Sequence, residues 1–239
     1  LENDWGSWIC TMTKETYGQV RQGIPVERLG GISNAMAIRH AAAHAYYDTE
    51  NEVVDAARKS MFTHRDVHAL GGGEFFARVT HRVINGATPS NAIASAALEM
   101  ERFFQDKVAQ AIEKVKEALD ENSALFQEKF SDDLAITSMA KLWDVGRSEP
   151  IKVGKASPTE GTLPGAVYFI LKYENVEDGL KKALQANTMV GGDNASRGIA
   201  IGMVLGAYKG VNAIPLEWKE TLDEWDYCEE MLNKLPLLK

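Results

Sequence analysis

Apolar residues recur every three or four positions through most of the chain, which is the period of an amphipathic helix. The longest periodic stretch follows the helix-start signal Thr88-Pro89-Ser90. Its apolar positions run from Ile93 to Leu119, and Lys and Glu occupy the opposite face. Few runs show the period of two that a half-buried strand requires. The pattern therefore predicts an all-α fold in a single domain, with eight or nine helices.

The same pattern divides the chain into expected helices and loops. Helices are expected over residues 33–47, 50–63, 66–85, 88–119, 131–143, 164–173, 176–189, 194–208 and 222–233. Gly and Pro interrupt residues 1–32 and 144–164, so both segments are expected to be irregular. The run Gly71-Gly72-Gly73 is expected to weaken its helix by roughly 1 kcal/mol for each glycine.

Composition and charge narrow the class of protein. The chain has 239 residues and a formal net charge of −8, with 34 Asp and Glu against 26 Lys and Arg. Nucleic acid is not an expected partner, because phosphate binding needs clustered basic residues. No run of apolar residues is long enough to predict a membrane span. Cys10 and Cys228 form no disulfide framework, which favours reduced thiols and a soluble reducing compartment, the cytoplasm or an organelle interior.

The most distinctive motif is the turn Gly191-Gly192-Asp193-Asn194-Ala195-Ser196. Two glycines allow a tight turn and a close approach of the backbone to a ligand. Asp193 follows them where a helix is expected to begin. Its carboxylate would either cap that helix or offer an oxygen ligand to a hard cation such as Mg²⁺. From these residues alone the cap is the commoner arrangement, and both stay open.

The residues around this turn carry a family resemblance. The helix after the turn ends in Gly206-Ala207-Tyr208-Lys209-Gly210, and Ile214-Pro215-Leu216-Glu217-Trp218 follows. Together with the turn, this resembles the carboxyl-terminal signature of the ADP-ribosylglycohydrolase family. The segments Ser33–Arg39 and Ser60–His64 resemble two further family elements in the same order. The resemblance covers Ser33 to Leu222, so the expected organisation is an irregular segment 1–32, a helical domain 33–222 and a helical tail 223–239.

The resemblance implies an orthogonal helical bundle of the ADP-ribosylglycohydrolase type, apparently without the family's N-terminal part. It also implies an ADP-ribose-like ligand near Asn34, His64, Gly191 and Gly192, with Asp193 and Ser196 as residual magnesium ligands. Members that hydrolyse ADP-ribose linkages hold two Mg²⁺ ions. Here Ala195 occupies the position of their second carboxylate in the turn, and residues 1–32 lack their early acidic motif.

The form Gly-Gly-Asp-Asn-x-Ser-Arg is similar to the J1-crystallin and selenoprotein J branch of that family. We therefore expect a degraded di-magnesium site, with magnesium weak or absent, and a mainly binding or structural role. One alternative is a working magnesium-dependent hydrolase whose front part is absent from this chain. Another is a scaffold subunit of a larger assembly. The catalytic residues stay unassigned.

Other clusters have plainer interpretations. The pairs His40/His44 and His64/His68 have the spacing of zinc ligands on a helix, but a structural or surface role is expected for both. Asp132-Asp133 is expected to be a helix N-cap. The tail aromatics Trp218, Trp225 and Tyr227 either cover the core or anchor a protein partner through the C-terminal tail.

Overall fold

The structure is a computed structural model that describes residues 9–31, 40–139, 142–143, 151–152 and 157–238. Most described residues are helical, as expected. The helices are α1 (Thr11–Arg21), α2 (Glu50–Ser60), α3 (Val67–Ile84), α4 (Pro89–Leu98), α5 (Arg102–Leu119), α6 (Ala124–Gln127), α7 (Ser131–Ser138), α8 (Thr159–Tyr173), α9 (Gly179–Val190), α10 (Asn194–Lys209), α11 (Leu216–Glu220) and α12 (Trp225–Leu232).

Short elements complete the described fold. The 3₁₀ turns are η1 (Val26–Arg28), η3 (Ala41–Ala45), η5 (Val211–Ala213) and η6 (Pro236–Leu238). The strands β1 (Leu142–Trp143) and β2 (Ile151–Lys152) pair antiparallel, with Leu142 opposite Lys152. In the part of the chain that the structure describes, no helix is both long and apolar enough to span a bilayer.

Helix α8 is the centre of the bundle. All residues from Gly161 to Ile170 are buried, which is the pattern of a helix surrounded by others. It packs against α3, α4, α5, α9 and α10. The main core contains side chains from these helices and from α7. Thus a helix of only 15 residues organises the bundle, because every face of it is apolar or small.

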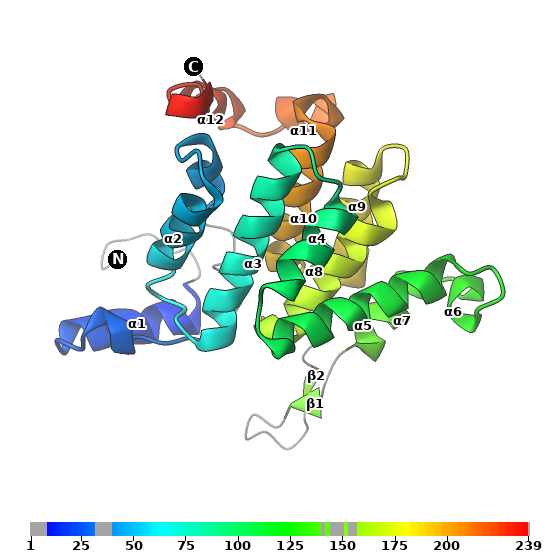
Figure 1. Ribbon diagram of the computed structural model, residues 1–239, viewed down its shortest axis with the longest axis horizontal. Coiled ribbons are helices and arrows are strands. Elements are labelled where there is room, and N and C mark those ends of the chain that lie inside the picture. The colour runs from blue at the N-terminus through cyan, green and yellow to red at the C-terminus, as the bar shows by residue number, and fades with distance from the viewer. Residues whose placement is uncertain (1–8, 32–39, 140–141, 144–150, 153–156, 239) are drawn as a thin grey trace.

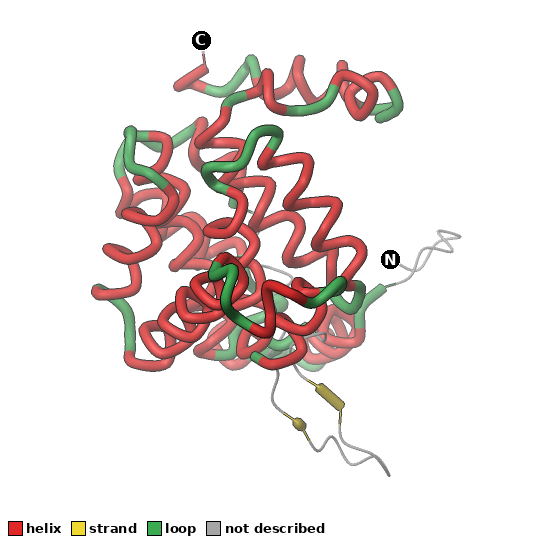
Figure 2. The backbone as a smooth tube through the Cα atoms, turned by 90° about the vertical axis from the view of Figure 1, so that its right-hand side faces the viewer, coloured by secondary structure: helices red, strands yellow, loops and turns green. Residues whose placement is uncertain are grey.

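The bundle has two distinguishable ends. In Figure 1, α3 begins at the lower end of the bundle, from which the β1–β2 pair projects. The C-terminal helices α11 and α12 lie across the opposite end, as Figure 2 shows.

Several expected boundaries were wrong. The helix expected over residues 33–47 is, within the described residues 40–47, only the 3₁₀ turn η3. Residues 11–21 form α1 within a segment expected to be irregular; Cys10 caps this helix by accepting a hydrogen bond from Thr13 N. The expected helix over 131–143 ends at Ser138, and Leu142–Trp143 forms β1. Helix α8 begins at Thr159 rather than Pro164. Pro164 lies inside the helix and is buried, so tertiary packing overrides its unfavourable helix propensity.

The long periodic stretch from Thr88 to Leu119 is two helices, which is also a correction. Helix α4 ends at Leu98 and α5 starts at Arg102. Both apolar faces point into the same core, α4 mainly against α3 and α5 mainly against α8. The apolar period therefore continues across the break, and periodicity alone does not reveal the change of direction.

Candidate functional site

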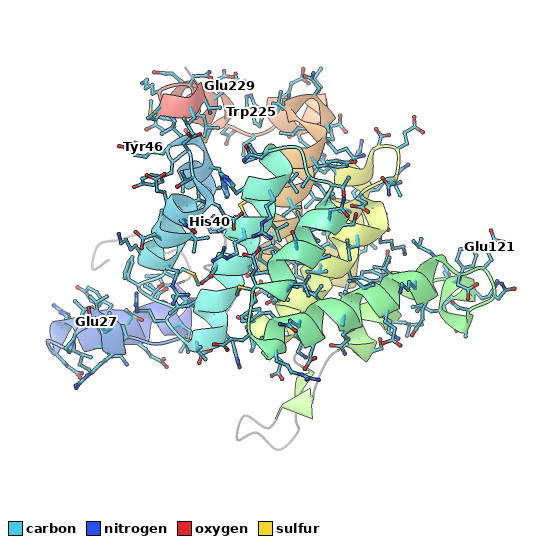
Figure 3. The ribbon with its side chains drawn as sticks, in the orientation of Figure 1. Glu27, His40, Tyr46, Glu121, Trp225 and Glu229 are labelled. Carbon is cyan, nitrogen blue, oxygen red and sulfur yellow. The ribbon has the colours of Figure 1, made fainter. Side chains whose placement is uncertain are left out.

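The turn Gly191–Ser196 links α9 to α10. Gly191 and Gly192 adopt φ values of 72° and 68°, a region that residues with a Cβ rarely occupy. The two glycines therefore make the abrupt reversal possible. Figure 3 draws the side chains of the described residues on the ribbon, in the orientation of Figure 1.

Asp193 caps α10. Its Oδ1 accepts a 3.2 Å hydrogen bond from Ser196 N, and its Oδ2 accepts a 2.9 Å hydrogen bond from Ser196 Oγ. Both carboxylate oxygens therefore have a donor within the turn. The cap interpretation is confirmed, and Ser196 donates both of the hydrogen bonds that the carboxylate accepts in the turn. The expected pair Asp193 and Ser196 does come together, while the neighbouring Ala195 is exposed.

Arg197 lies beneath the turn and was not anticipated from the sequence. It is fully buried, with its Nε donating to Asn187 Oδ1 at 2.8 Å and its Nη2 donating to the Gly191 carbonyl at 2.5 Å. The Asn187 amide also donates to Asn194 O at 2.8 Å. The sequence carries no signal for this placement, because the space is made by Gly165 of α8, where a Cβ would lie 2.9 Å from Arg197 Cδ.

Burial lowers the pKa of Arg197, and the negative charge of Asp193 opposes that effect. The guanidinium stays charged, because even a substantially lowered arginine pKa lies above neutral pH. The turn therefore combines one carboxylate with a permanent internal cation.

The donor set can be compared with what Mg²⁺ needs. Mg²⁺ takes about six oxygen ligands in near-octahedral geometry, usually with one or two carboxylates among them. Among the described residues, no three His, Cys, Asp or Glu side chains gather closely enough to hold a metal ion. Asp193 and Ser196 alone, beside the buried Arg197, do not fit a di-magnesium cage.

His64 is fully buried at the start of α3. Its Nδ1 lies 2.7 Å from Thr63 Oγ1, and the Thr63 carbonyl accepts a 3.2 Å hydrogen bond from Thr16 of α1. Asp66 N donates to the Gly31 carbonyl at 3.3 Å. The segment before α3 is thus fastened to α1 and Gly31. Asn34, the other ligand residue expected near here, lies outside the described residues.

The histidines of both pairs make contacts within the protein. His68 stacks on Phe103, with the ring centroids 3.8 Å apart, whereas His64 is bonded to Thr63. The rings of His40 and His44 meet edge to face at 5.5 Å. Burial, with the nearby His40 and His81, lowers the pKa of His44 to about 3.

Asp132 has a larger role than the expected N-cap. Phe130 occupies the N-cap position of α7, which corrects that expectation. The Asp132 carboxylate instead accepts hydrogen bonds from Tyr168, Lys172 and Tyr173 of α8. It borders a pocket of about 280 Å³ that extends to Met189 and Val190, directly before the glycine turn.

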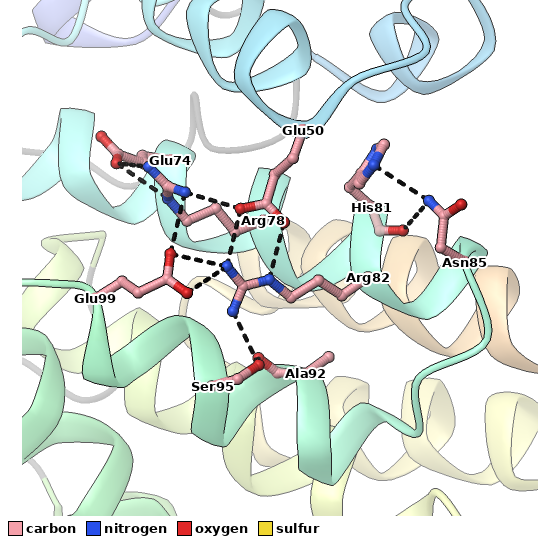
Figure 4. A network of polar contacts seen from close by, with 9 residues as sticks. All are labelled: Glu50, Glu74, Arg78, His81, Arg82, Asn85, Ala92, Ser95 and Glu99. Atoms are coloured by element: carbon pink, nitrogen blue, oxygen red, sulfur yellow. Dashed lines mark hydrogen bonds and ion pairs between the residues drawn. The ribbon is translucent and has the colours of Figure 1, made fainter.

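A second polar network joins α2, α3 and α4 (Figure 4). Arg82 donates to both Glu50 and Glu99, and Arg78 bonds to Glu50, Glu74 and Glu99. Glu99 lies in the break between α4 and α5, so this network holds the break against α3. Every carboxylate in Figure 4 is paired with arginine, which indicates a structural role.

The tail aromatics do not enter the core. Trp218 and Trp225 are half-buried and Tyr227 is 58% exposed, and no residue of α11 or α12 is buried. Figure 3 labels Trp225 and Glu229 on α12, and the last turn of the tail, η6, packs against η3. The role of the tail in binding a partner stays a prediction.

Comparison with known proteins places these features in context. The family model described as ADP-ribosylglycohydrolase matches residues 2–239. A relative, ADP-ribosylhydrolase ARH3 of Danio rerio, is 21% identical over 231 residues. The match covers 86% of this chain and 57% of the relative, so the chain spans little more than half the length of that protein.

Proposed function

The chain belongs to the ADP-ribosylglycohydrolase family, and we propose that within it this protein binds a ligand or serves a structural role without magnesium-dependent hydrolysis. The proposal assigns it to the J1-crystallin and selenoprotein J branch. The observation that carries the proposal is the use of Asp193 as a helix cap, with both carboxylate oxygens bonded to Ser196.

The chemistry of the metal supports this proposal. Two bound Mg²⁺ ions would polarise the ribosyl linkage and activate a water molecule, which requires several carboxylates directed at one point. Ala195 contributes no oxygen where hydrolysing members are expected to have a carboxylate. Arg197 adds positive charge under the same turn. Each of these differences disfavours a divalent cation.

The proposed ligand is an ADP-ribose-like molecule. The backbone at Gly191 and Gly192 can approach a ligand closely, because neither residue has a Cβ. The N-terminus of α10 favours the negative charge of a diphosphate. His64 and Asn34 are the further residues proposed to contact the ligand. None of these contacts requires a metal ion.

The direct test measures release of ADP-ribose from an O-linked ADP-ribosylated peptide, with and without millimolar Mg²⁺. The expected result is no release above the protein-free rate under either condition. The matched control is Asp193→Asn, which keeps the cap but removes the charge. Release that needs Mg²⁺ and is lost in Asp193→Asn would establish a hydrolase and reject the proposal. Titration calorimetry with ADP-ribose tests the binding role separately.

An active hydrolase is the second candidate. It is supported by the match to a protein named ADP-ribosylhydrolase, of which this chain spans 57%. The discriminating observation is the full open reading frame. Paired acidic residues in a Gly-rich helix upstream of Leu1 would favour the hydrolase, and the release assay would then be repeated on the longer protein.

A scaffold subunit is the third candidate, and the exposed tail supports it. Large apolar side chains are exposed in the tail and directly before it, namely Leu216, Leu222, Tyr227, Leu232, Leu237 and Leu238. Such a surface is typical of a protein interface. Co-purification with another chain at a fixed ratio, lost on removal of residues 223–239, would support this role. A monodisperse monomer would reject it.

A further inference from the structure

The largest fully buried side chain in the described part of the chain is a cation, Arg197. It stands in the first turn of α10 and extends between α8 and α9. Asn187 and the Gly191 carbonyl accept its hydrogen bonds, and Gly165 leaves the space for its methylene groups. Gly165 and Asn187 come from two other helices, so the arginine occupies a place built for it.

A buried guanidinium requires compensation. Removing a charge from water is costly unless opposite charge and hydrogen-bond acceptors surround it. Two of its acceptors are an amide oxygen and a backbone carbonyl, both uncharged. Asp193 supplies the negative charge whose field favours the charged guanidinium. Asp193, the carboxylate that would bind a metal ion, therefore already balances the charge of Arg197.

The substitution at Ala195 and the arginine at 197 change the charge of the turn in the same direction. Ala195 offers no carboxylate where the metal-binding form of the motif is expected to have one, and Arg197 places a positive charge in the first turn of α10. A divalent cation binds where carboxylates leave the site negative. The net charge of this turn, from Asp193 and Arg197, is instead close to zero with no ion bound.

We propose that Arg197 takes the place of the divalent cation at this turn, so that the Gly191–Ser196 turn keeps its structure without Mg²⁺. This inference rests on the proposed function and deepens it. It attributes the loss of metal binding to the replacement of the ion by Arg197, and not to missing ligands alone.

The test uses thermal unfolding and calorimetry, with MgCl₂ as the only ligand, on the full chain. The variants are Ala195→Asp, Arg197→Met and the double variant. Ala195 is exposed, so Ala195→Asp is expected to fold. The melting temperature of the unmodified chain and of Ala195→Asp is expected to be the same in Mg²⁺ and in EDTA. The double variant is expected to bind Mg²⁺ at least about tenfold more tightly than Ala195→Asp, with a higher melting temperature in Mg²⁺ than in EDTA.

Equal Mg²⁺ affinity of Ala195→Asp and the double variant would overturn the inference, because Arg197 would then not exclude the ion. Should variants lacking Arg197 fail to fold, Asp193→Asn tests the same idea on a chain that retains the arginine. This variant is expected to lower the melting temperature by roughly 3 °C or more, equally in Mg²⁺ and EDTA, since it removes the countercharge of the guanidinium. An unchanged melting temperature would overturn the inference.

The two proposals can fail independently. Release of ADP-ribose without any need for Mg²⁺ would reject the proposed function and leave the role of Arg197 intact. A melting temperature of the unmodified chain that rises in Mg²⁺, in a protein that releases no ADP-ribose, would reject the role of Arg197 alone.

Discussion

The hydroxyl of Tyr168 donates a 2.7 Å hydrogen bond to Asp132 Oδ1, which joins α7 to the centre of α8. The same carboxylate accepts from Lys172 at 2.6 Å and from Tyr173 at 3.0 Å. Burial, followed by the negative charge of Asp132, raises the pKa of both tyrosines above the usual range, so each hydroxyl remains a donor. One carboxylate thus satisfies three donors in the wall of the 280 Å³ pocket.

We predict that Asp132→Asn lowers the free energy of unfolding by about 2–3 kcal/mol, because an amide can neither pair with Lys172 nor accept all three hydrogen bonds. Urea unfolding measures the change. Asp106→Asn is the control, since that carboxylate is exposed and lies 3.5 Å from Arg102 in a surface pair. Equal stability of the two variants would contradict a structural role for Asp132.

Gly71→Ala is predicted to destabilise the protein, although alanine usually stabilises a helix. A Cβ at this position would lie 2.3 Å from Phe104 Cζ, so the α3–α5 contact would have to shift, at a cost of about 1–3 kcal/mol. Gly18→Ala in α1 is the matched control. A Cβ there meets no atom within 4 Å, and a gain of about 0.5–1 kcal/mol is expected.

A double variant separates this clash from other effects of the substitution. Phe104→Leu should recover part of the stability lost in Gly71→Ala, giving a favourable coupling in a double-mutant cycle. Simple additivity of the two changes would show that the contact between the positions is not the cause.

The stability of the protein is predicted to fall between about pH 7 and pH 5 because of His44. Its ring nitrogens are buried, and its pKa is about 3 in the folded state against 6.5 for an ordinary histidine. The unfolded chain therefore binds a proton that the folded chain does not, and the stability lost by about pH 5 amounts to about 1–2 kcal/mol. His44→Phe removes this titration. Chemical unfolding across this range should show a shallower slope for the variant, and an identical slope would refute the assignment.

Glu50→Gln is predicted to weaken the packing of α2 on α3. Hydrogen bonds from Arg82, and next the charge of that arginine, hold the pKa of Glu50 below its usual value despite partial burial. The lowered pKa means that this stabilisation is present at neutral pH and is lost as the pH falls through the folded-state pKa. A loss of about 1–2 kcal/mol at neutral pH is expected, with less stability lost on acidification than in the unmodified chain.

The control for this prediction is Asp55→Asn. Asp55 pairs with Lys59, but both side chains are largely exposed, and no measurable change is expected. Urea unfolding at neutral and acidic pH distinguishes the two variants. A pH dependence of Glu50→Gln that matches the unmodified chain would show that Glu50 does not titrate with folding.

The sequence by itself determined the features that depend on neighbouring residues. The helical period predicted the all-α fold, and α10 at residues 194–209 lies within one residue of its expected bounds. Asp193 could be identified as a cap, because a cap needs only a side chain and the backbone three residues later. The glycine turn and the family signature are likewise contiguous. Local geometry dictates such features wherever the segment lies in the fold.

The tertiary structure decided everything that depends on residues distant in sequence. Asp132 meets Tyr168 across 36 positions, and Arg197 fits beneath Gly191 because Gly165 on another helix makes room. The sequence pattern did not reveal the break between α4 and α5, because the apolar faces of both helices pack into one core. A sequence pattern shows that a side chain prefers burial or a polar partner. Only the path of the chain brings that partner within reach. In this protein it directs the Asp132 carboxylate to three donors on α8 instead of to the N-terminus of α7, and it buries Arg197 beneath the Gly191–Ser196 turn.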